Sequence, residues 1–280
     1  MKQQEINHLI DSALDGNAEG LEQLLLSVQD LIFNLSLRML GTVPDAEDAT
    51  QDILVRIMTS LSTFRKESSF QTWVYRIAMN YLINYKKSMF AKHPLDFEFY
   101  GNDIQYASTD ETEHLVDEMT RKTMAEELKM SCTNVMLQCL DPESRCIFIL
   151  GTMFKVDSRI AGDILNMTAE NYRQKLCRVR KKVGDFLAAY CGLSGTGCCS
   201  CEKRVGYAIS QHRINPEKPE FLKLKTADKD VMAAFKNEME QLDELSLVFE
   251  ELPDYQSPAA VKKRISSLIQ SSQFQAIQSF

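Results

Sequence analysis

Apolar residues recur three and four positions apart along almost the whole chain, and no segment alternates strictly between apolar and polar residues. The first spacing places apolar side chains on one face of an α-helix, whereas strict alternation is typical of a β-strand. The pattern therefore predicts an all-α protein. Its first stripe ends at Gly41 and Pro44 and consists of Leu21, Leu24, Leu25, Val28, Leu31, Ile32, Leu35 and Met39.

Two more helices are expected before residue 91. One begins near Asp45, where carboxylates suit the positive end of the helix dipole, and it buries Ile53 and Ile57. The next runs over 69–88 with Phe70, Trp73, Ile77 and Tyr81 on its inner face. Residues 1–91 are therefore predicted to form one helical domain.

A change of composition marks the end of this domain. Between Pro94 and Glu118 there are many carboxylates but no Lys or Arg, and Gly101-Asn102-Asp103 interrupts the periodicity. Such a segment is typical of a solvated spacer, so residues 92–130 are predicted to be an acidic linker.

The helical spacing returns in residues 131–190. Asp141-Pro142-Glu143 supplies a cap, a proline for the first turn and a carboxylate, which together mark a helix start. A short helix over 157–165, a turn at Asn166-Met167-Thr168 and a long basic helix to about Ala189 then follow. This is the helix-turn-helix pattern of DNA-binding domains.

Residues 191–280 form a fourth segment, a cysteine-containing helical extension. It begins with a cysteine-rich loop and ends with a helix expected over 259–272. Between them an amphipathic helix is expected over 228–251, with Met232, Phe235, Met239, Leu242 and Leu245 on its apolar face.

Composition narrows the function classes. The 280 residues are 44% hydrophobic and 25% charged, as in ordinary globular proteins, with a net charge of −7. No run of about 18 apolar residues and no signal-like start occurs, which predicts a cytoplasmic protein without membrane insertion. No triad, phosphate loop or paired carboxylates appear, so we expect neither an enzyme nor a required cofactor.

Charged residues concentrate on three surfaces. The first is acidic and exposed on the helix that buries Ile53, and charge alone would also fit a merely solvated face. It comprises Asp45, Asp48, Gln51 and Asp52. The second, a loop and helix, combines aromatic, hydroxyl and basic groups, which an unstacked base and its phosphate need. It comprises Phe64, Arg65, Lys66, Ser68, Ser69, Tyr75, Arg76, Asn80, Lys86 and Lys87.

The third surface is the second helix of the helix-turn-helix. Such helices contact base edges from their first turns and phosphates from their flanks. The residues expected on base edges are Glu170, Asn171, Arg173 and Gln174, and those expected on phosphates are Lys175, Arg178 and Lys181.

The order Asp45-Ala-Glu-Asp-Ala-Thr-Gln-Asp, Phe64-Arg-Lys-Glu-Ser-Ser and then the helix-turn-helix resembles bacterial RNA polymerase sigma factors of the extracytoplasmic-function (ECF) group. The resemblance covers about residues 5–190. It implies that the acidic face docks on core RNA polymerase, that the loop after Phe64 captures a flipped base of the −10 promoter element, and that the helix-turn-helix reads the −35 element.

The resemblance also implies that the acidic linker follows the RNA-exit path, and an anti-sigma factor is a further partner to consider. Three positions depart from the family pattern. Asn84 and Lys87 stand where Asp and Arg are common, and Gly162 stands where a polar residue is usual. A helix-turn-helix repressor or activator that acts without core polymerase remains the alternative.

Four cysteines close together raise a separate question. Cys191, Cys198, Cys199 and Cys201 lack the paired Cys-x₂-Cys spacing of strong zinc motifs, yet their thiolates are suitable zinc ligands. Thiols beside Lys203 and Arg204 would also suit an oxidant sensor. Zinc binding, redox sensing and a purely structural role all remain open, and the first two would make the protein a metal- or redox-responsive regulator.

Overall fold

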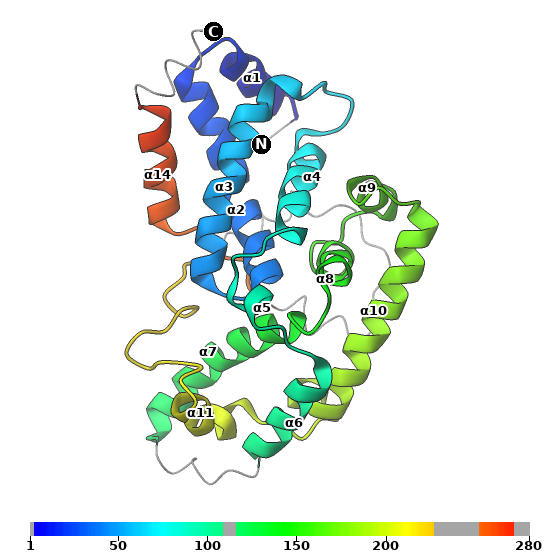
Figure 1. Ribbon diagram of the computed structural model, residues 1–280. Coiled ribbons are helices and arrows are strands. Elements are labelled where there is room, and N and C mark those ends of the chain that lie inside the picture. The colour runs from blue at the N-terminus through cyan, green and yellow to red at the C-terminus, as the bar shows by residue number, and fades with distance from the viewer. Residues whose placement is uncertain (1–2, 109–115, 227–251, 272–280) are drawn as a thin grey trace.

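The computed structural model describes residues 3–108, 116–226 and 252–271 and confirms the all-α prediction for them (Figure 1). Within these ranges the single β-type contact is an isolated antiparallel bridge between Thr226 and Tyr255. None of the helices in the described ranges combines the length and apolar character needed to cross a bilayer.

The first helices form a bundle around α2. Its members are α1 (Gln3–Leu14), α2 (Ala18–Leu40), α3 (Val43–Ser60), the 3₁₀ turn η1 (Leu61–Thr63) and α4 (Phe70–Ile83). The helix α2 is buried along most of its length, and its predicted apolar stripe lies in the core. Gly41 ends it with φ of 87°, and a Cβ there would lie 2.9 Å from the Phe90 ring, so both the turn and the space require glycine. The helix predicted over 69–88 ends at Ile83, five residues early.

Helices also occupy much of the predicted linker. After α5 (Met89–Lys92), α6 (Phe97–Ser108) packs Phe97 and Tyr100 against Phe186, with ring centroids 5.0 and 5.9 Å away. The next helix, α7, begins at Glu118. The acidic segment is therefore partly folded onto the protein, while the proposed domain limits stay a prediction.

The helix-turn-helix part begins with α7 (Glu118–Leu137) and α8 (Pro142–Phe148). Asp141 caps α8 as expected, and the helix continues as one π-helical turn over Ile149–Met153. The pair α9 (Ser158–Ile164) and α10 (Ala169–Tyr190) follows, with Thr168 as the N-cap of α10. Both halves share one apolar core, and Arg145 Nη1 donates across it to the Met39 carbonyl oxygen at 2.6 Å.

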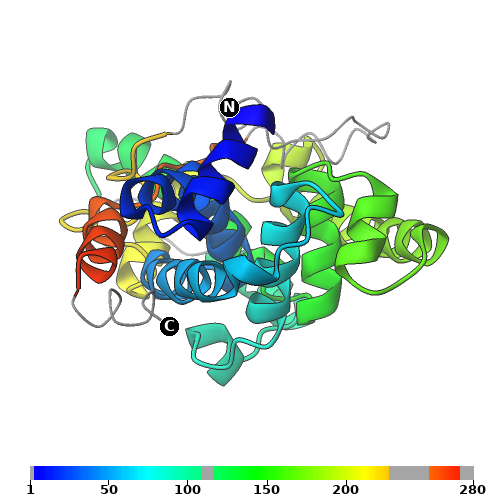
Figure 2. The ribbon, with the colours of Figure 1, turned by 90° about the horizontal axis from the view of Figure 1, so that it is seen from above.

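The C-terminal extension contacts both halves of the protein. A 3₁₀ turn, η4 (Gly192–Ser194), leads to α11 (Cys201–Ser210), which packs on α7, whereas α14 (Ala259–Ile269) packs on α2 and α3. Figure 2 shows α14 and α10 on opposite sides of the molecule. The amphipathic helix expected over 228–251 lies outside the described residues.

Candidate protein and nucleic-acid interfaces

The acidic surface of α3 is present as predicted and is partly engaged by neighbouring residues. Asp48 and Asp52 are exposed, whereas Asp45 and Gln51 are half-buried. Thr42 Oγ1 and the Met89 N–H donate to Asp45 Oδ2 at 2.9 and 3.2 Å. Asp48 therefore presents its carboxylate outward from an ordered helix.

Two tyrosines border this acidic surface, Tyr81 in α4 and Tyr85 just after its end. Tyr81 donates its hydroxyl to Asp52, and burial followed by this hydrogen bond raises the Tyr81 pKa. Burial also raises the pKa of Tyr85, and the charges of Asp45, Asp48 and Asp52 add to the effect. The three carboxylates thus act together on one region, a concentration of negative charge that suits a basic protein partner.

The loop before α4 meets the prediction only in part. Arg65 and Lys66 are exposed, Lys66 has a left-handed backbone (φ 59°), and its ammonium group pairs with Asp11. Ser69 caps α4 by accepting the Thr72 N–H at 3.1 Å, and Ser68 is half-buried beside it. Phe64 is only 8% exposed and packs against Phe70 and Trp73, so in this conformation it is a core residue and not a wall for a base.

One of the predicted DNA contacts on α4 is buried, whereas the others are at least partly exposed. Tyr75 is 2% exposed and meets the Phe154 ring edge-on at 6.3 Å, so its assignment as a stacking residue is wrong for this conformation. Tyr75 therefore lies in the contact between the two halves, because Phe154 follows the π-helical turn. The surface residues that remain are Arg76, half-buried, and Asn80, Lys86 and Lys87, all exposed.

The helix-turn-helix is formed as expected, and its close turn explains Gly162. A Cβ at Gly162 would lie 2.7 Å from the Met167 carbonyl oxygen, so only glycine allows the approach. Asn166 takes up the left-handed turn with φ of 54°. The polar residue common at this position in the family would not fit here.

The predicted base-contacting residues of α10 all lie on open surface. Glu170, Asn171, Arg173 and Gln174 are exposed, and Arg173 Nη1 donates to Ser158 Oγ at 3.0 Å, which links the two helices. Among the phosphate candidates Arg178 and Lys181 are exposed, while Lys175 is half-buried and pairs with Glu143. The nearby Arg180 points inward and binds Thr152 Oγ1 and the Gly151 carbonyl oxygen.

Three of the four cysteines of the predicted cluster lie together in the structure, and the fourth lies apart. Cys198 is exposed, whereas Cys191, Cys199 and Cys201 line a small cavity of about 30 Å³ together with Cys132 from α7. In the described part of the chain no three His, Cys, Asp or Glu side chains are placed to hold a metal ion. Zinc binding by Cys191, Cys198, Cys199 and Cys201 therefore stays a prediction.

Burial also bears on thiol chemistry. It raises the pKa of Cys191 and Cys199, and it raises that of Cys201 to about 12. Thiols with raised pKa values stay protonated near neutral pH and react slowly with oxidants. Of the other four cysteines, Cys139 and Cys146 are buried, Cys132 is half-buried and Cys177 is exposed.

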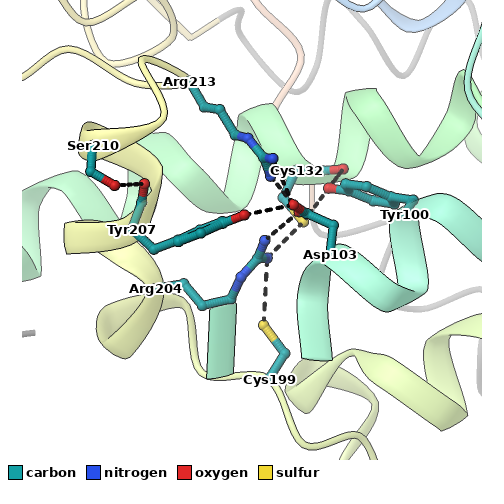
Figure 3. A network of polar contacts seen from close by, with 8 residues as sticks. All are labelled: Tyr100, Asp103, Cys132, Cys199, Arg204, Tyr207, Ser210 and Arg213. Carbon is teal, nitrogen blue, oxygen red and sulfur yellow. Dashed lines mark hydrogen bonds and ion pairs between the residues drawn. The ribbon is translucent and has the colours of Figure 1, made fainter. Parts of the chain in front are cut away.

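A polar network joins the extension to the acidic segment (Figure 3). Asp103 of α6 accepts from Arg213 Nη2 at 2.6 Å, from the Tyr207 hydroxyl at 2.9 Å and from Arg204 Nη2 at 3.4 Å. Burial opposes ionisation of Asp103, but these hydrogen bonds and charges leave its pKa below the ordinary value. Arg204 Nη1 also lies 3.9 and 3.8 Å from the sulfurs of Cys132 and Cys199.

Sequence reasoning missed this network. Asp103 and its arginine partners are more than a hundred positions apart along the chain, and no local spacing relates them. The one indication in the sequence was that the acidic segment between Pro94 and Glu118 contains no Lys or Arg, so a buried carboxylate there needs a cation from elsewhere in the chain.

The sequence of this chain is similar to those of known proteins. The model of sigma-70 region 2 matches residues 24–89. The RNA polymerase sigma-H factor of Pseudomonas aeruginosa is 21% identical over 67% of this chain and 96% of its own length. The ECF RNA polymerase sigma factor SigW of Bacillus subtilis is 25% identical over 63% of this chain and 93% of its own.

A solved structure described as CnrH in complex with the cytosolic domain of CnrY aligns with 65% of this chain and 97% of that chain, at 19% identity and a TM-score of 0.47. The matched residues 24–89 coincide with most of α2, all of α3 and all of α4, the helices that hold the acidic surface and the basic loop. The chain thus matches the sigma-70 region 2 family over residues 24–89 and is similar to RNA polymerase sigma factors, the ECF factor SigW among them.

Proposed function

We propose that this protein is a transcription initiation factor that binds core RNA polymerase and directs it to promoters. The observation that carries the proposal is the coincidence of the region 2 match with an ordered acidic helix and a basic loop. The relatives named above align over nearly their whole lengths, which supports the same division of labour.

Core polymerase binds at α3 in this proposal. Asp48 and Asp52 supply exposed charge, and a rigid helix holds them one turn apart. Charge complementarity of this kind accelerates encounter and fixes register more than it adds affinity. Asp45 and Gln51 contribute after their internal partners have been exchanged for those of the polymerase.

Promoter DNA binds at two places. The first turns of α10 carry Arg173, Asn171 and Gln174 to base edges of the −35 element, and Arg178 and Lys181 bind phosphates. The loop before α4 offers Arg65 and the hydroxyls of Ser68 and Ser69 to the −10 element. Arg76, Asn80, Lys86 and Lys87 continue toward the displaced strand.

Melting takes place by stabilisation of unpaired bases, without chemical catalysis by this protein, which acts in the bacterial cytoplasm where transcription occurs. Tyr75 is covered by Phe154 of the other half, so its contact with DNA requires the two halves to separate, whereas Phe64 would have to leave its contacts with Phe70 and Trp73. An anti-sigma partner and a zinc ion at the cysteines remain hypotheses of the sequence.

Run-off transcription tests the proposal. Purified core polymerase from the source organism is supplied with fragmented genomic DNA, with and without the protein, and discrete new transcripts are the expected result. Arg173→Ala should weaken promoter binding and leave polymerase binding intact, while Lys223→Ala, an exposed charge in the extension, should alter neither. Failure to bind core polymerase, with specific DNA binding retained, would favour the helix-turn-helix repressor or activator.

A further inference from the structure

One face of α2 carries polar side chains that bind the extension. Asp30, Asn34 and Arg38 are four residues apart, so they follow one line along the helix. Asn34 Nδ2 donates to the Tyr255 carbonyl oxygen at 2.7 Å, and its Oδ1 accepts the Tyr255 N–H at 2.8 Å. Arg38 Nη2 donates to the Pro253 carbonyl oxygen at 2.6 Å.

The same line of contacts continues to the start of α14. Asp30 Oδ1 accepts the Ser257 N–H at 2.8 Å, and Gln29 donates to the Ser257 hydroxyl. Gln29, Asn34 and Arg38 are at most 1% exposed. These buried polar groups form hydrogen bonds to one extended segment, and a buried polar group without a partner is costly. This face of α2 is therefore a binding site for that segment.

From there α14 lies against α2 and α3 (Figure 1). Its inner face is the stripe Val261, Ile265 and Ile269, each at most 3% exposed. Arg264 Nη1 donates to Gln51 Oε1 at 2.8 Å, and this glutamine belongs to the surface assigned to polymerase. Ser266 donates to Glu22 of α2 on the same side.

We propose that residues 252–271 are an intramolecular inhibitor that covers one edge of the polymerase-docking surface and must leave before polymerase binds. The inference rests on the proposed function. A helix with its side chains is about 10–12 Å wide, so a partner that contacts Gln51 together with Asp48 and Asp52 collides with α14 and displaces Arg264. Asp48 and Asp52 stay exposed and give the polymerase a first point of attachment.

The contact is suited to release. Release costs the hydrogen bonds of Asn34 and Arg38 to the segment, while Arg38 keeps its hydrogen bond to Asn134 of α7 and the half-buried Asp30 can exchange its partner for water. The apolar contribution of α14 is limited to one short stripe. A partner that binds only the open form has its apparent affinity reduced by the fraction of molecules that are open, which is how the segment regulates docking.

The test uses the full-length chain and the variant Ile265→Asp, which places a carboxylate in the buried stripe. Ser267→Asp is the matched control, because it adds the same charge to an exposed position of the same helix. Hydrogen exchange of residues 259–269 reports release, circular dichroism reports the fold, and fluorescence anisotropy reports affinity for core polymerase. Arg264→Ala, on an exposed side chain, removes the Gln51 contact without touching the stripe.

Ile265→Asp is expected to expose residues 259–269 to exchange and to raise the affinity for core polymerase at least tenfold, with a smaller gain for Arg264→Ala and none for Ser267→Asp. If polymerase binds the wild type and the released variant equally, inhibition is refuted and the proposed function stands. If neither binds, the proposed function fails together with the inhibition. A weaker affinity for the released variant would make the segment part of the binding surface, which also overturns the proposal.

Discussion

Glu127 of α7 offers a sharp test of how the extension is held. Its carboxylate, 2% exposed, accepts backbone N–H groups from three consecutive residues, at 2.6 Å from Glu220, 3.1 Å from Phe221 and 2.9 Å from Leu222. Phe221 in turn packs against Tyr255, with ring centroids 6.3 Å apart. One carboxylate therefore fixes the loop on which the segment after residue 252 rests.

The informative change is Glu127→Gln, which keeps the shape and removes the charge. The amide group has one oxygen, so its NH₂ faces at least one backbone N–H and two charge-assisted hydrogen bonds are lost. Each such bond contributes about 1.5–3 kcal/mol. We expect the loop at 219–222 to lose about 3 kcal/mol of local stability, which is roughly 150-fold in its opening equilibrium.

Hydrogen exchange by mass spectrometry measures this effect directly, because exchange of these three amides follows local opening. Glu126→Gln is the control, since Glu126 is the neighbouring residue and is exposed. Exchange should become about a hundredfold faster in Glu127→Gln and stay unchanged in the control. A change of less than threefold in Glu127→Gln, or an equal change in both variants, would refute the view that the carboxylate anchors the loop.

Three further predictions concern other parts of the molecule. The pKa of Asp103 is lower in the folded protein, so its contribution to stability is complete above the ordinary carboxyl pKa of about 3.9 and is lost as the pH falls through the lower folded value. Acid should therefore loosen α11, which hydrogen exchange can measure. Asp103→Asn should remove this pH dependence. Gly162→Ala should destabilise the helix-turn-helix by about 1–3 kcal/mol in urea unfolding, because the Met167 carbonyl oxygen must move; an unchanged midpoint would contradict this. Iodoacetamide should modify the exposed Cys177 and Cys198 rapidly. It should modify Cys146 only when the protein unfolds, because Cys146 is buried and burial raises the pKa of its thiol. Early labelling of Cys146 would contradict this prediction and would show that the core opens.

Local features of the fold were predictable from the sequence. Asp141 caps α8 where the sequence indicated, because a cap depends on residues three positions away. The acidic surface of α3 and the open face of α10 followed for a similar reason, since helical periodicity decides which side chains face outward.

The contacts that the sequence did not reveal are all between distant residues. Tyr75 was assigned to the surface because it lies off the apolar stripe of α4, yet Phe154 from the other half covers it. Cys132 of α7 lies with the cysteines of the extension, about sixty positions further along the chain, and no local spacing relates them. Arg38 is fully buried on α2 because it binds Asn134 and Pro253, which no spacing near Arg38 indicates.

The distance along the chain between Asn34 and Tyr255, 221 positions, sets an order of events during synthesis. At about 5–20 residues per second a ribosome needs roughly 10–45 s to add the residues between them. Throughout that interval the helices α2 and α3 already exist, while the segment that covers their flank has not yet been made. Each newly synthesised molecule therefore passes through a brief period in which its docking surface is uncovered, and the abundance of free polymerase near the ribosome decides whether that period is used.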